Sequence, residues 1–239
     1  MMKPVLSTLF AAFASLAIQA APTQVIGVPA APWSYPDNPA AGIVPEYFKF
    51  LFEKAGAEMT VRTMPYLRVI EGLKDGTAEA TLLIPDAERD TFAFNLCSPT
   101  QIRSGLLYSK AKLPKVAKPE DLAGKRIGFL RGTKAIDKAK SIADIKPNDI
   151  ENVGQGLQML VADRLDATFI SSPGIDTLLK EKNMNAADYG FVEVATAPVA
   201  LYVSRKSELF KNEALKAKLK SECEGSAKGF MQTLMQKYH

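Results

Sequence analysis

The chain has 239 residues, 47% of them hydrophobic, and its formal net charge is +4 at pH 7. This length suffices for one large domain or two small lobes with a buried core, and the apolar content excludes a disordered chain. Lysine and glutamate are interspersed without a basic block, so the composition indicates no nucleic-acid partner.

The start of the chain has the pattern of a secretory signal peptide, which we assign to residues 1–20. Lys3 provides the positive charge, residues 5–18 provide the apolar stretch, and Ala20 is the small residue at the cleavage site. No later stretch approaches the roughly 20 apolar residues of a membrane span. We therefore expect a soluble mature protein that begins near Ala21 and is exported to the periplasm.

The first half of the mature chain predicts the order β-α-β-α-β. The predicted elements are a strand at residues 25–28, a helix at 46–55, a strand at 59–64, a helix at 67–74, and a polar turn leading into a buried strand that ends at 84. The continuous apolar run of this last strand is typical of a parallel sheet.

The second half predicts the same order about a hundred residues later. Its predicted elements are a strand at residues 126–129, a helix at 134–143, a short strand at 149–153, a helix at 155–162, and a buried strand that ends at 170. Each half is therefore predicted to be an open α/β unit.

Two strand-like segments, residues 103–110 and 198–206, join the halves and resemble each other. We expect the chain to cross to the second unit at the first segment and to return at the other. The predicted fold class is α/β: two open α/β lobes joined by a double-crossover hinge. Lobe 1 would comprise residues 21–102 and 200–239, and lobe 2 residues 103–199. Ligands of open sheets bind beyond the carboxyl ends of the strands, so the cleft between the lobes is the expected site.

The C-terminal residues 214–237 predict a helical stretch that packs on lobe 1. This placement puts Cys223 in the same lobe as Cys97, the only other cysteine. An exported protein meets an oxidising compartment, where an even pair of cysteines suggests one disulfide. Spacing in the sequence does not fix the distance between the two residues, so a disulfide and two buried thiols both stay open.

The chain resembles the bacterial extracellular solute-binding proteins of family 3, which have the type II periplasmic-binding-protein fold. The resemblance covers essentially the whole mature chain. It implies a monomeric two-lobed receptor without a cofactor, which closes over a small polar solute and passes it to an inner-membrane ABC permease. The phrases that carry the resemblance, in chain order, are APWSYPDN, GIVPEYFKFLFEKAG, AERDTFAFN, SGLLYSK, PEDLAGKRIGFLRGT, DATFISSP and ALYVSRK.

The phrase PDAERD places Arg89 among three carboxylates, those of Asp86, Glu88 and Asp90. The resemblance implies that Arg89 binds the carboxylate of the ligand, because a guanidinium offers a rigid fork of donors to two oxygens. The alternative is an ion pair at the surface, which would contribute little. One or more of the neighbouring acids would orient Arg89 in the first case.

Further ligand-binding candidates follow strand ends on both lobes. On lobe 1 they are Tyr66, as an aromatic wall against the ligand, together with Trp33, Tyr35, Arg68 and Ile84. On lobe 2, Thr133 precedes a helix and can cap it while its hydroxyl faces an anion, and Arg131 lies two residues earlier.

Two places depart from the family pattern. The first lobe's loop, usually glycine and hydroxyl residues in the family, reads Leu82, Leu83, Ile84, Pro85. Amino-acid receptors of this family carry an acid near the end of the DATFIS strand, where it pairs with the ligand's ammonium, and this chain has Ser171 there. An unpaired ammonium in a closed cleft would be costly. The ligand is therefore an organic anion without an α-amino group, or an amino acid whose ammonium meets Asp86 or Glu46; the first reading is slightly favoured.

Catalysis has little support in the sequence, and we predict that the protein is not an enzyme. His239 is the only histidine and ends the chain, which excludes Ser-His-Asp, Cys-His and histidine metal sites, and no phosphate-binding glycine motif follows a strand. Two alternatives remain: a periplasmic dehydratase of the cyclohexadienyl type, with Glu88 or Glu46 as an acid whose pKa burial has raised, and a soluble ligand-sensing protein.

Overall fold

The computed structural model describes residues 21–141 and 143–238. The proposed signal peptide and His239 lie outside these residues. The strands are β1 (Thr23–Gly27), β2 (Met59–Thr63), β3 (Ala80–Leu83), β4 (Ala93–Ser109), β5 (Arg126–Leu130), β6 (Lys146–Ile150), β7 (Ala167–Ser171) and β8 (Tyr189–Ser204). The helices are α1 (Ile43–Ala55), α2 (Tyr66–Asp75), α3 (Ala135–Lys140), α4 (Val153–Val161), α5 (Ile175–Glu181), α6 (Glu208–Lys211), α7 (Glu213–Glu224) and α8 (Ser226–Lys237).

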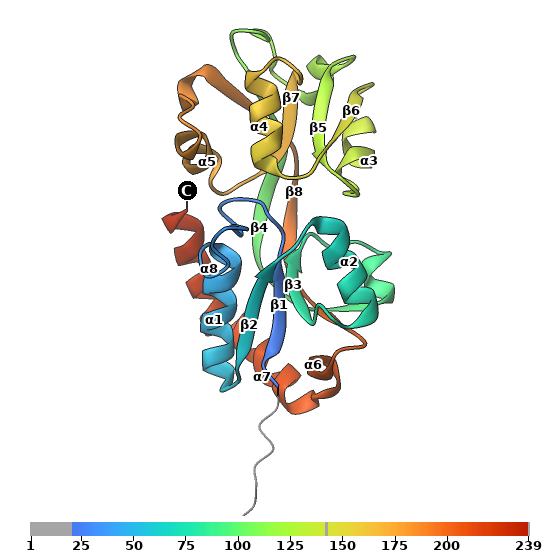
Figure 1. Cartoon of the computed structure of the whole chain (residues 1–239), viewed down its shortest axis with the longest axis vertical. Helices are drawn as coiled ribbons and strands as arrows, with labels where there is room; N and C mark the ends of the chain where they lie inside the picture. The colour runs from blue at the N-terminus through green and yellow to red at the C-terminus, as the bar shows by residue number, and fades with distance from the viewer. Residues whose placement is uncertain (1–20, 142, 239) are drawn as a thin grey trace, which may run out of the picture.

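The strands follow one another in the order β2-β1-β3-β8-β4-β7-β5-β6. β1 pairs in parallel with β2 and β3, and β5 pairs in parallel with β6 and β7. The two parallel groups are the centres of two lobes, stacked one above the other in Figure 1. In each lobe the helices of the β-α-β-α-β order cover the sheet, so the predicted α/β architecture is confirmed.

The long antiparallel pair of β4 and β8 runs through both lobes and connects them (Figure 1). Both strands are much longer than the segments predicted at residues 103–110 and 198–206, and the proposed lobe boundaries fall inside them. The β4–β8 register shifts between Asn95 and Cys97, between Cys97 and Thr100, and between Ser104 and Gly105. Such bulges bend and twist a strand locally.

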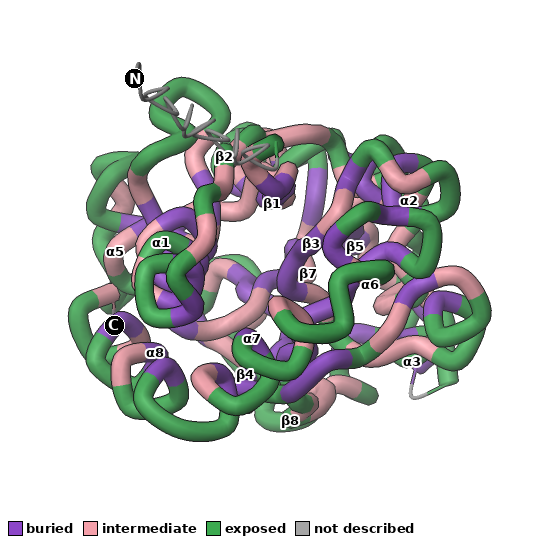
Figure 2. The backbone as a smooth tube through the Cα atoms, turned by 90° about the horizontal axis from the view of Figure 1, so that it is seen from below, coloured by how far each residue is buried: buried purple, intermediate pink, exposed green. Residues whose placement is uncertain are grey.

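The core of the first lobe forms between its sheet and the C-terminal helices. Tyr47, Phe48 and Leu51 of α1 are fully buried and belong to one cluster with Leu219 of α7 and Met231 of α8. Figure 2 shows buried backbone along α1 and the sheet, with the exposed segments on the outside. The predicted packing of the C-terminal stretch on lobe 1 is thus found.

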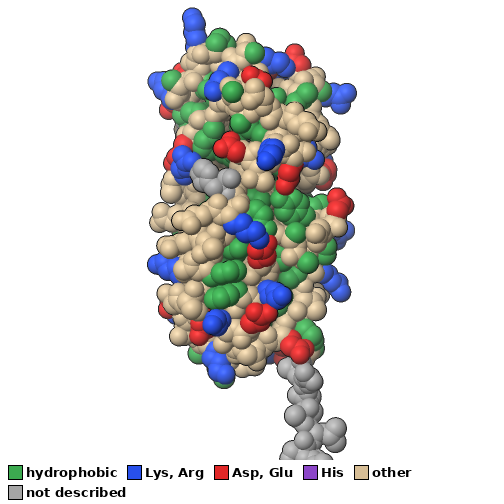
Figure 3. All heavy atoms as spheres, turned by 90° about the vertical axis from the view of Figure 1, so that its left-hand side faces the viewer, with side chains coloured by type: hydrophobic (Ala, Val, Ile, Leu, Met, Phe, Trp, Pro, Cys, Tyr) green, Lys and Arg blue, Asp and Glu red, His purple; other side chains and the backbone are tan. Residues whose placement is uncertain are grey.

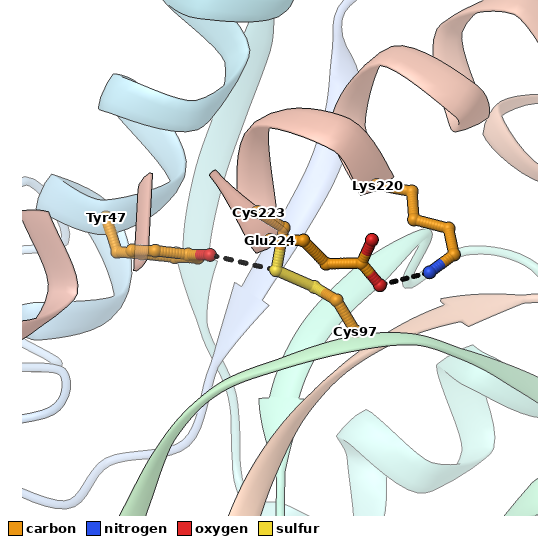
Figure 4. Close-up of a disulfide and its surroundings, with 5 residues drawn as sticks. All are labelled: Tyr47, Cys97, Lys220, Cys223 and Glu224. Atoms are coloured by element: carbon orange, nitrogen blue, oxygen red, sulfur yellow. Dashed lines mark hydrogen bonds and ion pairs between the residues drawn. A yellow bond between two sulfur atoms is a disulfide. The ribbon is translucent and has the colours of Figure 1, made fainter. Parts of the chain in front are cut away.

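A disulfide joins Cys97 of β4 to Cys223 of α7, with the two Cα atoms 6.5 Å apart (Figure 4). This finding decides the question that the sequence left open. The Tyr47 hydroxyl lies 3.2 Å from Cys223 Sγ and donates a hydrogen bond to it. Lys220 and Glu224 form an ion pair on the same helix, beside the disulfide. The bridge fixes the C-terminal helices to the base of the hinge strand.

Several element boundaries differ from the prediction. The strand expected at residues 149–153 is β6, Lys146–Ile150, because the side chain of Asn152 accepts a hydrogen bond from the Gln155 N–H and begins α4 there. The single C-terminal stretch is divided into α7 and α8 at Gly225, and α5 was not predicted. Among the described residues, no helix combines the length and the apolar character that crossing a membrane requires.

Candidate functional site: a cavity between the lobes

A cavity of about 360 Å³ lies between the lobes, within the size range of small-molecule sites. The carboxyl ends of β1 and β3 from the first lobe and of β5 and β7 from the second lobe meet around it, with the middle of β4 and β8 as its floor. This is the location expected for ligands of open α/β sheets.

Most of the cavity wall is apolar. It is formed by Val28, Ala30, Ala31, Trp33, Val44, Leu82, Leu83, Ile84, Pro85, Ile102, Leu130, Ala135, Val153, Phe169, Ile170, Val194, Ala195, Ala197 and Val199. The charged residues on the wall are Arg89, Lys134 and Lys138, against the single carboxylate of Asp86. An apolar wall with an excess of positive charge favours an anion that has an apolar body.

Arg89 begins the short 3-10 turn η1 (Arg89–Thr91) just after β3 and is only 6% exposed. Its Nη1 donates a hydrogen bond to the Ile84 carbonyl oxygen, and its Nη2 donates to the Tyr66 hydroxyl at 2.8 Å. The guanidinium also lies over the ring of Tyr202, with 5.1 Å between Cζ and the ring centroid. Its Nε is buried without a hydrogen-bond partner among the described residues.

The three acids beside Arg89 do not pair with its guanidinium. Asp86 Oδ1 instead accepts hydrogen bonds from the backbone N–H groups of Glu88 and Arg89, at 3.0 and 3.1 Å. Asp90 Oδ1 accepts one from the Tyr202 hydroxyl at 2.8 Å. The surface ion pair considered as an alternative is therefore wrong. Of the neighbouring acids, Asp86 contacts Arg89 through the backbone N–H and not through the guanidinium. The Arg89 guanidinium is thus a buried cation without a carboxylate partner in the described chain, an arrangement that is costly unless another group compensates the charge.

Glu88 and Asp86 make ion pairs across the cleft. Lys134 Nζ of the second lobe lies 2.9 Å from Glu88 Oε2 and 3.4 Å from Asp86 Oδ2. The hydrogen bond from Lys134 lowers the pKa of Glu88. Burial acts to raise the pKa of Asp86, but hydrogen bonds from the Arg89 backbone N–H and from Lys134 outweigh it and the pKa is lowered. Both acids are thus ionised at neutral pH.

The lobes also meet through an apolar contact between chain neighbours of the cavity residues Tyr66 and Thr133. Leu67 of α2 packs on Gly132 of the second lobe, where a Cβ atom would lie only 2.2 Å from Leu67 Cδ2. Gly132 has a φ of +79°, so a side chain there would also be strained. This contact and the Lys134 ion pairs hold the lobes together over the cavity.

Most of the candidate ligand-binding residues line the cavity. They are Trp33, Tyr66, Ile84 and Arg89 on the side of the first lobe, and Thr133 and Ser171 on the side of the second. Thr133 Oγ1 accepts a long hydrogen bond from the Ala135 N–H, at 3.4 Å, but the N-cap of α3 is Lys134, so the capping role predicted for Thr133 is not found. The Ser171 hydroxyl, at the end of β7, lies 2.9 Å from the Ser104 hydroxyl of β4.

Three other candidates lie outside the cavity, each held by a partner. The Tyr35 hydroxyl donates a hydrogen bond to Glu181 Oε1 at 2.9 Å, which makes it a contact between the lobes. Arg68 Nη1 pairs with Glu71 at 3.1 Å on the exposed face of α2. Arg131 Nη1 pairs at 2.8 Å with Glu151.

Glu46, considered as an alternative partner for an ammonium, is also outside the cavity. Its carboxylate accepts hydrogen bonds from Lys237 and Tyr238. Burial acts to raise the pKa of Glu46, but these two hydrogen bonds outweigh it and the pKa is lowered. Glu46 and Glu88 therefore both lack the raised pKa that the dehydratase alternative requires.

The sequence did not indicate two polar residues of the cavity. Ser104 lies inside the strand-like segment SGLLYSK, where nothing separates it from a structural residue. Lys138 lies on α3, and only its placement one turn after Lys134 could have suggested that it faces the same space. The face seen in Figure 3 shows acidic and basic side chains interspersed over both lobes.

No family model matches the chain, and no curated protein matches it either. Solved structures do match over nearly their whole length. One is an ancestral arginine-binding protein bound to arginine, with a TM-score of 0.75 and 18% identity. The match covers 92% of this chain and 99% of the chain of that protein. The substrate-binding protein of an amino acid ABC transporter has a TM-score of 0.72 and 18% identity, with 90% of this chain and 99% of its own covered. The ligand-binding core of GluR0 from Nostoc punctiforme, in complex with L-glutamate, has a TM-score of 0.72 and 14% identity, with coverages of 91% and 99%.

Proposed function

We propose that this chain, which has the type II periplasmic-binding-protein fold, is an extracellular solute-binding protein that closes its two lobes over a small carboxylate-bearing solute. It would act in the periplasm as a monomer and pass the solute to an inner-membrane ABC permease. The structural relatives support a role in solute binding, since they include the substrate-binding protein of an amino acid ABC transporter. The observation that carries the proposal is Arg89, a buried guanidinium on the wall of an interlobe cavity without a carboxylate partner in the described chain.

The charges of the cavity support an organic anion over an amino acid. An ammonium would need a carboxylate, because its burial without one is costly. Asp86 is the only carboxylate that the described residues supply to the wall, and Lys134 and two backbone N–H groups already engage it. Lys134 and Lys138 would in addition repel a second cation. We therefore favour a ligand with a carboxylate, an apolar body and no α-amino group.

Lobe closure would couple binding to transport. Arg89 and Tyr66 belong to the first lobe, whereas Thr133 and Ser171 belong to the second, so a ligand between them contacts both only when the cleft is closed. Such a ligand shifts the equilibrium toward the closed state by its differential affinity for the two states. The bulged strands β4 and β8 are the connection about which the lobes would move.

A ligand-side experiment tests the proposal. Thermal unfolding of the mature protein would be recorded with a panel of small apolar carboxylic acids, each beside its neutral primary amide. A ligand at about 100 times its dissociation constant stabilises by roughly 2.7 kcal/mol, or about 5–11 °C for a protein of this size. We expect shifts with acids and none with their amides. Equal shifts with acid and amide, or no shift with any acid of the panel, would contradict the proposal.

A further inference from the structure

Two serine hydroxyls form a pair on the cavity wall. Ser104 of β4 and Ser171 of β7 lie directly opposite each other in the antiparallel register, and their Oγ atoms are 2.9 Å apart. Both residues line the cavity, and Ser104 is only 2% exposed. The residues nearby in the chain that also line the cavity, Ile102, Phe169 and Ile170, are apolar. This hydroxyl pair, Ser104–Ser171, is therefore a polar feature of an otherwise apolar part of the wall.

The hydrogen-bonding capacity of the pair is not exhausted by its own contact. A serine hydroxyl has one donor hydrogen and two acceptor lone pairs. One serine donates to the other, so the accepting serine keeps its own hydrogen, and lone pairs remain on both oxygens. Within residues 21–141 and 143–238, neither hydroxyl makes another hydrogen bond. The pair therefore offers one O–H donor and several acceptor sites to a ligand.

The pair is neutral, and the charged residues elsewhere on the cavity wall, Arg89, Lys134 and Lys138 against Asp86, are mostly cations. It therefore suits a neutral oxygen better than an ammonium, which would lack a counter-charge there. A keto oxygen can accept from the free O–H, and a hydroxyl can both accept and donate. A wholly apolar group at the same place would leave the O–H donor without a partner, which costs binding free energy.

We propose that the ligand carries a neutral oxygen, a hydroxyl or a keto group, in addition to its carboxylate, and that the hydroxyl pair recognises it. The inference rests on the proposed function, because the carboxylate must first bind at Arg89. The substrate class is thus hydroxy or oxo monocarboxylic acids with an apolar side chain. The hydroxyl pair determines specificity, and Arg89 determines that an acid binds at all.

Two matched ligand sets test the inference. The first set is 4-methylpentanoic acid with its 2-hydroxy, 2-oxo and 2-amino derivatives; the second is 3-phenylpropanoic acid with the same three derivatives. Calorimetric titration of the mature protein with each compound gives affinities at one pH and salt concentration. We expect the hydroxy or oxo derivative of at least one set to bind about 2- to 12-fold more tightly than the parent acid, the effect of one net hydrogen bond.

Variants of the pair assign this preference to its residues. Ser171→Ala is expected to remove the advantage of the oxygen derivative over the parent acid, and Ser104→Ala serves as the second variant if the first does not fold. Ser172→Ala is the matched control, since its hydroxyl accepts a hydrogen bond from the Arg103 N–H and does not line the cavity. Ser171→Asp is expected to shift the preference toward the 2-amino derivative by supplying the missing carboxylate.

The outcomes separate this inference from the proposed function. Parent acids that bind as tightly as their oxygen derivatives, or 2-amino derivatives that bind most tightly to the unsubstituted protein, would overturn the inference and leave a solute-binding protein. A preference that survives in both Ser171→Ala and Ser104→Ala would also overturn it. Failure of all eight compounds to bind the folded protein would overturn the ligand class proposed for the cavity and the inference with it.

Discussion

The central prediction concerns the geometry of Arg89, tested by the substitution Arg89→Lys. Lysine keeps the positive charge but replaces a planar fork of donors by a point charge. Arg89 now uses Nη1 for the Ile84 carbonyl oxygen and Nη2 for the Tyr66 hydroxyl, and it retains further N–H donors for a ligand. An ammonium has three donors and cannot satisfy both protein oxygens and two carboxylate oxygens at once.

The expected loss of ligand affinity follows from this count of hydrogen-bond donors. Arg89→Lys removes at least one charge-assisted hydrogen bond to the carboxylate, and such a bond contributes about 1.5–3 kcal/mol. The dissociation constant should therefore rise by about 10- to 150-fold, since each 1.4 kcal/mol is a factor of ten. Arg89→Ala would remove the charge as well and should weaken binding further.

Calorimetric titration with the best acid of the thermal screen measures this change. Arg205→Lys is a matched control in the same lobe: Arg205 also lies over aromatic rings, those of Phe94 and Phe210, but is outside the cavity. We expect its affinity to stay within about twofold of the parent protein. An Arg89→Lys variant that folds and binds as tightly as the parent would refute the assignment of Arg89 as the carboxylate site.

Two further predictions concern the disulfide and the ion pairs across the cleft. Replacing both Cys97 and Cys223 by serine removes a covalent link between residues 126 positions apart in the chain. The free energy of unfolding should fall by about 2–4 kcal/mol, which lowers the melting temperature by about 4–16 °C. An unchanged melting temperature would contradict this. The pKa of Asp86 is lowered, against its burial, by hydrogen bonds from the Arg89 backbone N–H and from Lys134, and the pKa of Glu88 is lowered by the hydrogen bond from Lys134. The contribution of their Lys134 ion pairs to closure is therefore present above the ordinary pKa values near 4 and is lost as the pH falls through the lowered values. Small-angle scattering should thus show a larger radius of gyration, from lobe opening, below about pH 4 and in Glu88→Gln at neutral pH. A radius of gyration that changes neither with pH nor with this substitution would argue against these ion pairs as closing contacts.

The sequence was sufficient to predict the helices and strands whose apolar residues recur at a regular period. The helix of residues 46–55 and the buried strand ending at residue 84 were found within a few residues of α1 and β3. The hinge strands were underestimated because Pro99 interrupts β4 and Pro198 interrupts β8, and proline inside a run argues against a strand. Pro99 lies at the register shift between Cys97 and Thr100, where the strand accommodates it.

The site could be predicted only in part, because a position after a strand does not fix where a side chain points. Arg89 and Arg68 both followed predicted elements of the first lobe, yet Arg89 is buried at the cavity and Arg68 is exposed. Glu71, three residues after Arg68 on the same helix, was a local sign of a surface ion pair. No comparable sign distinguished Ser104, whose importance depends on a strand 67 residues away in the chain.

The two halves of the chain share their order of elements but supply different chemistry to the cavity. In the first lobe, β3 ends in a turn that holds a cation, Arg89, against the Tyr66 hydroxyl. In the second lobe, the equivalent strand β7 ends in Ser171, a neutral hydroxyl. A ligand that lies between these strand ends experiences a charged contact on one side and a neutral one on the other. Affinity for an acid would then depend mainly on the first lobe, and discrimination among acids on the second, so substitutions in β7 should change the ligand without abolishing binding.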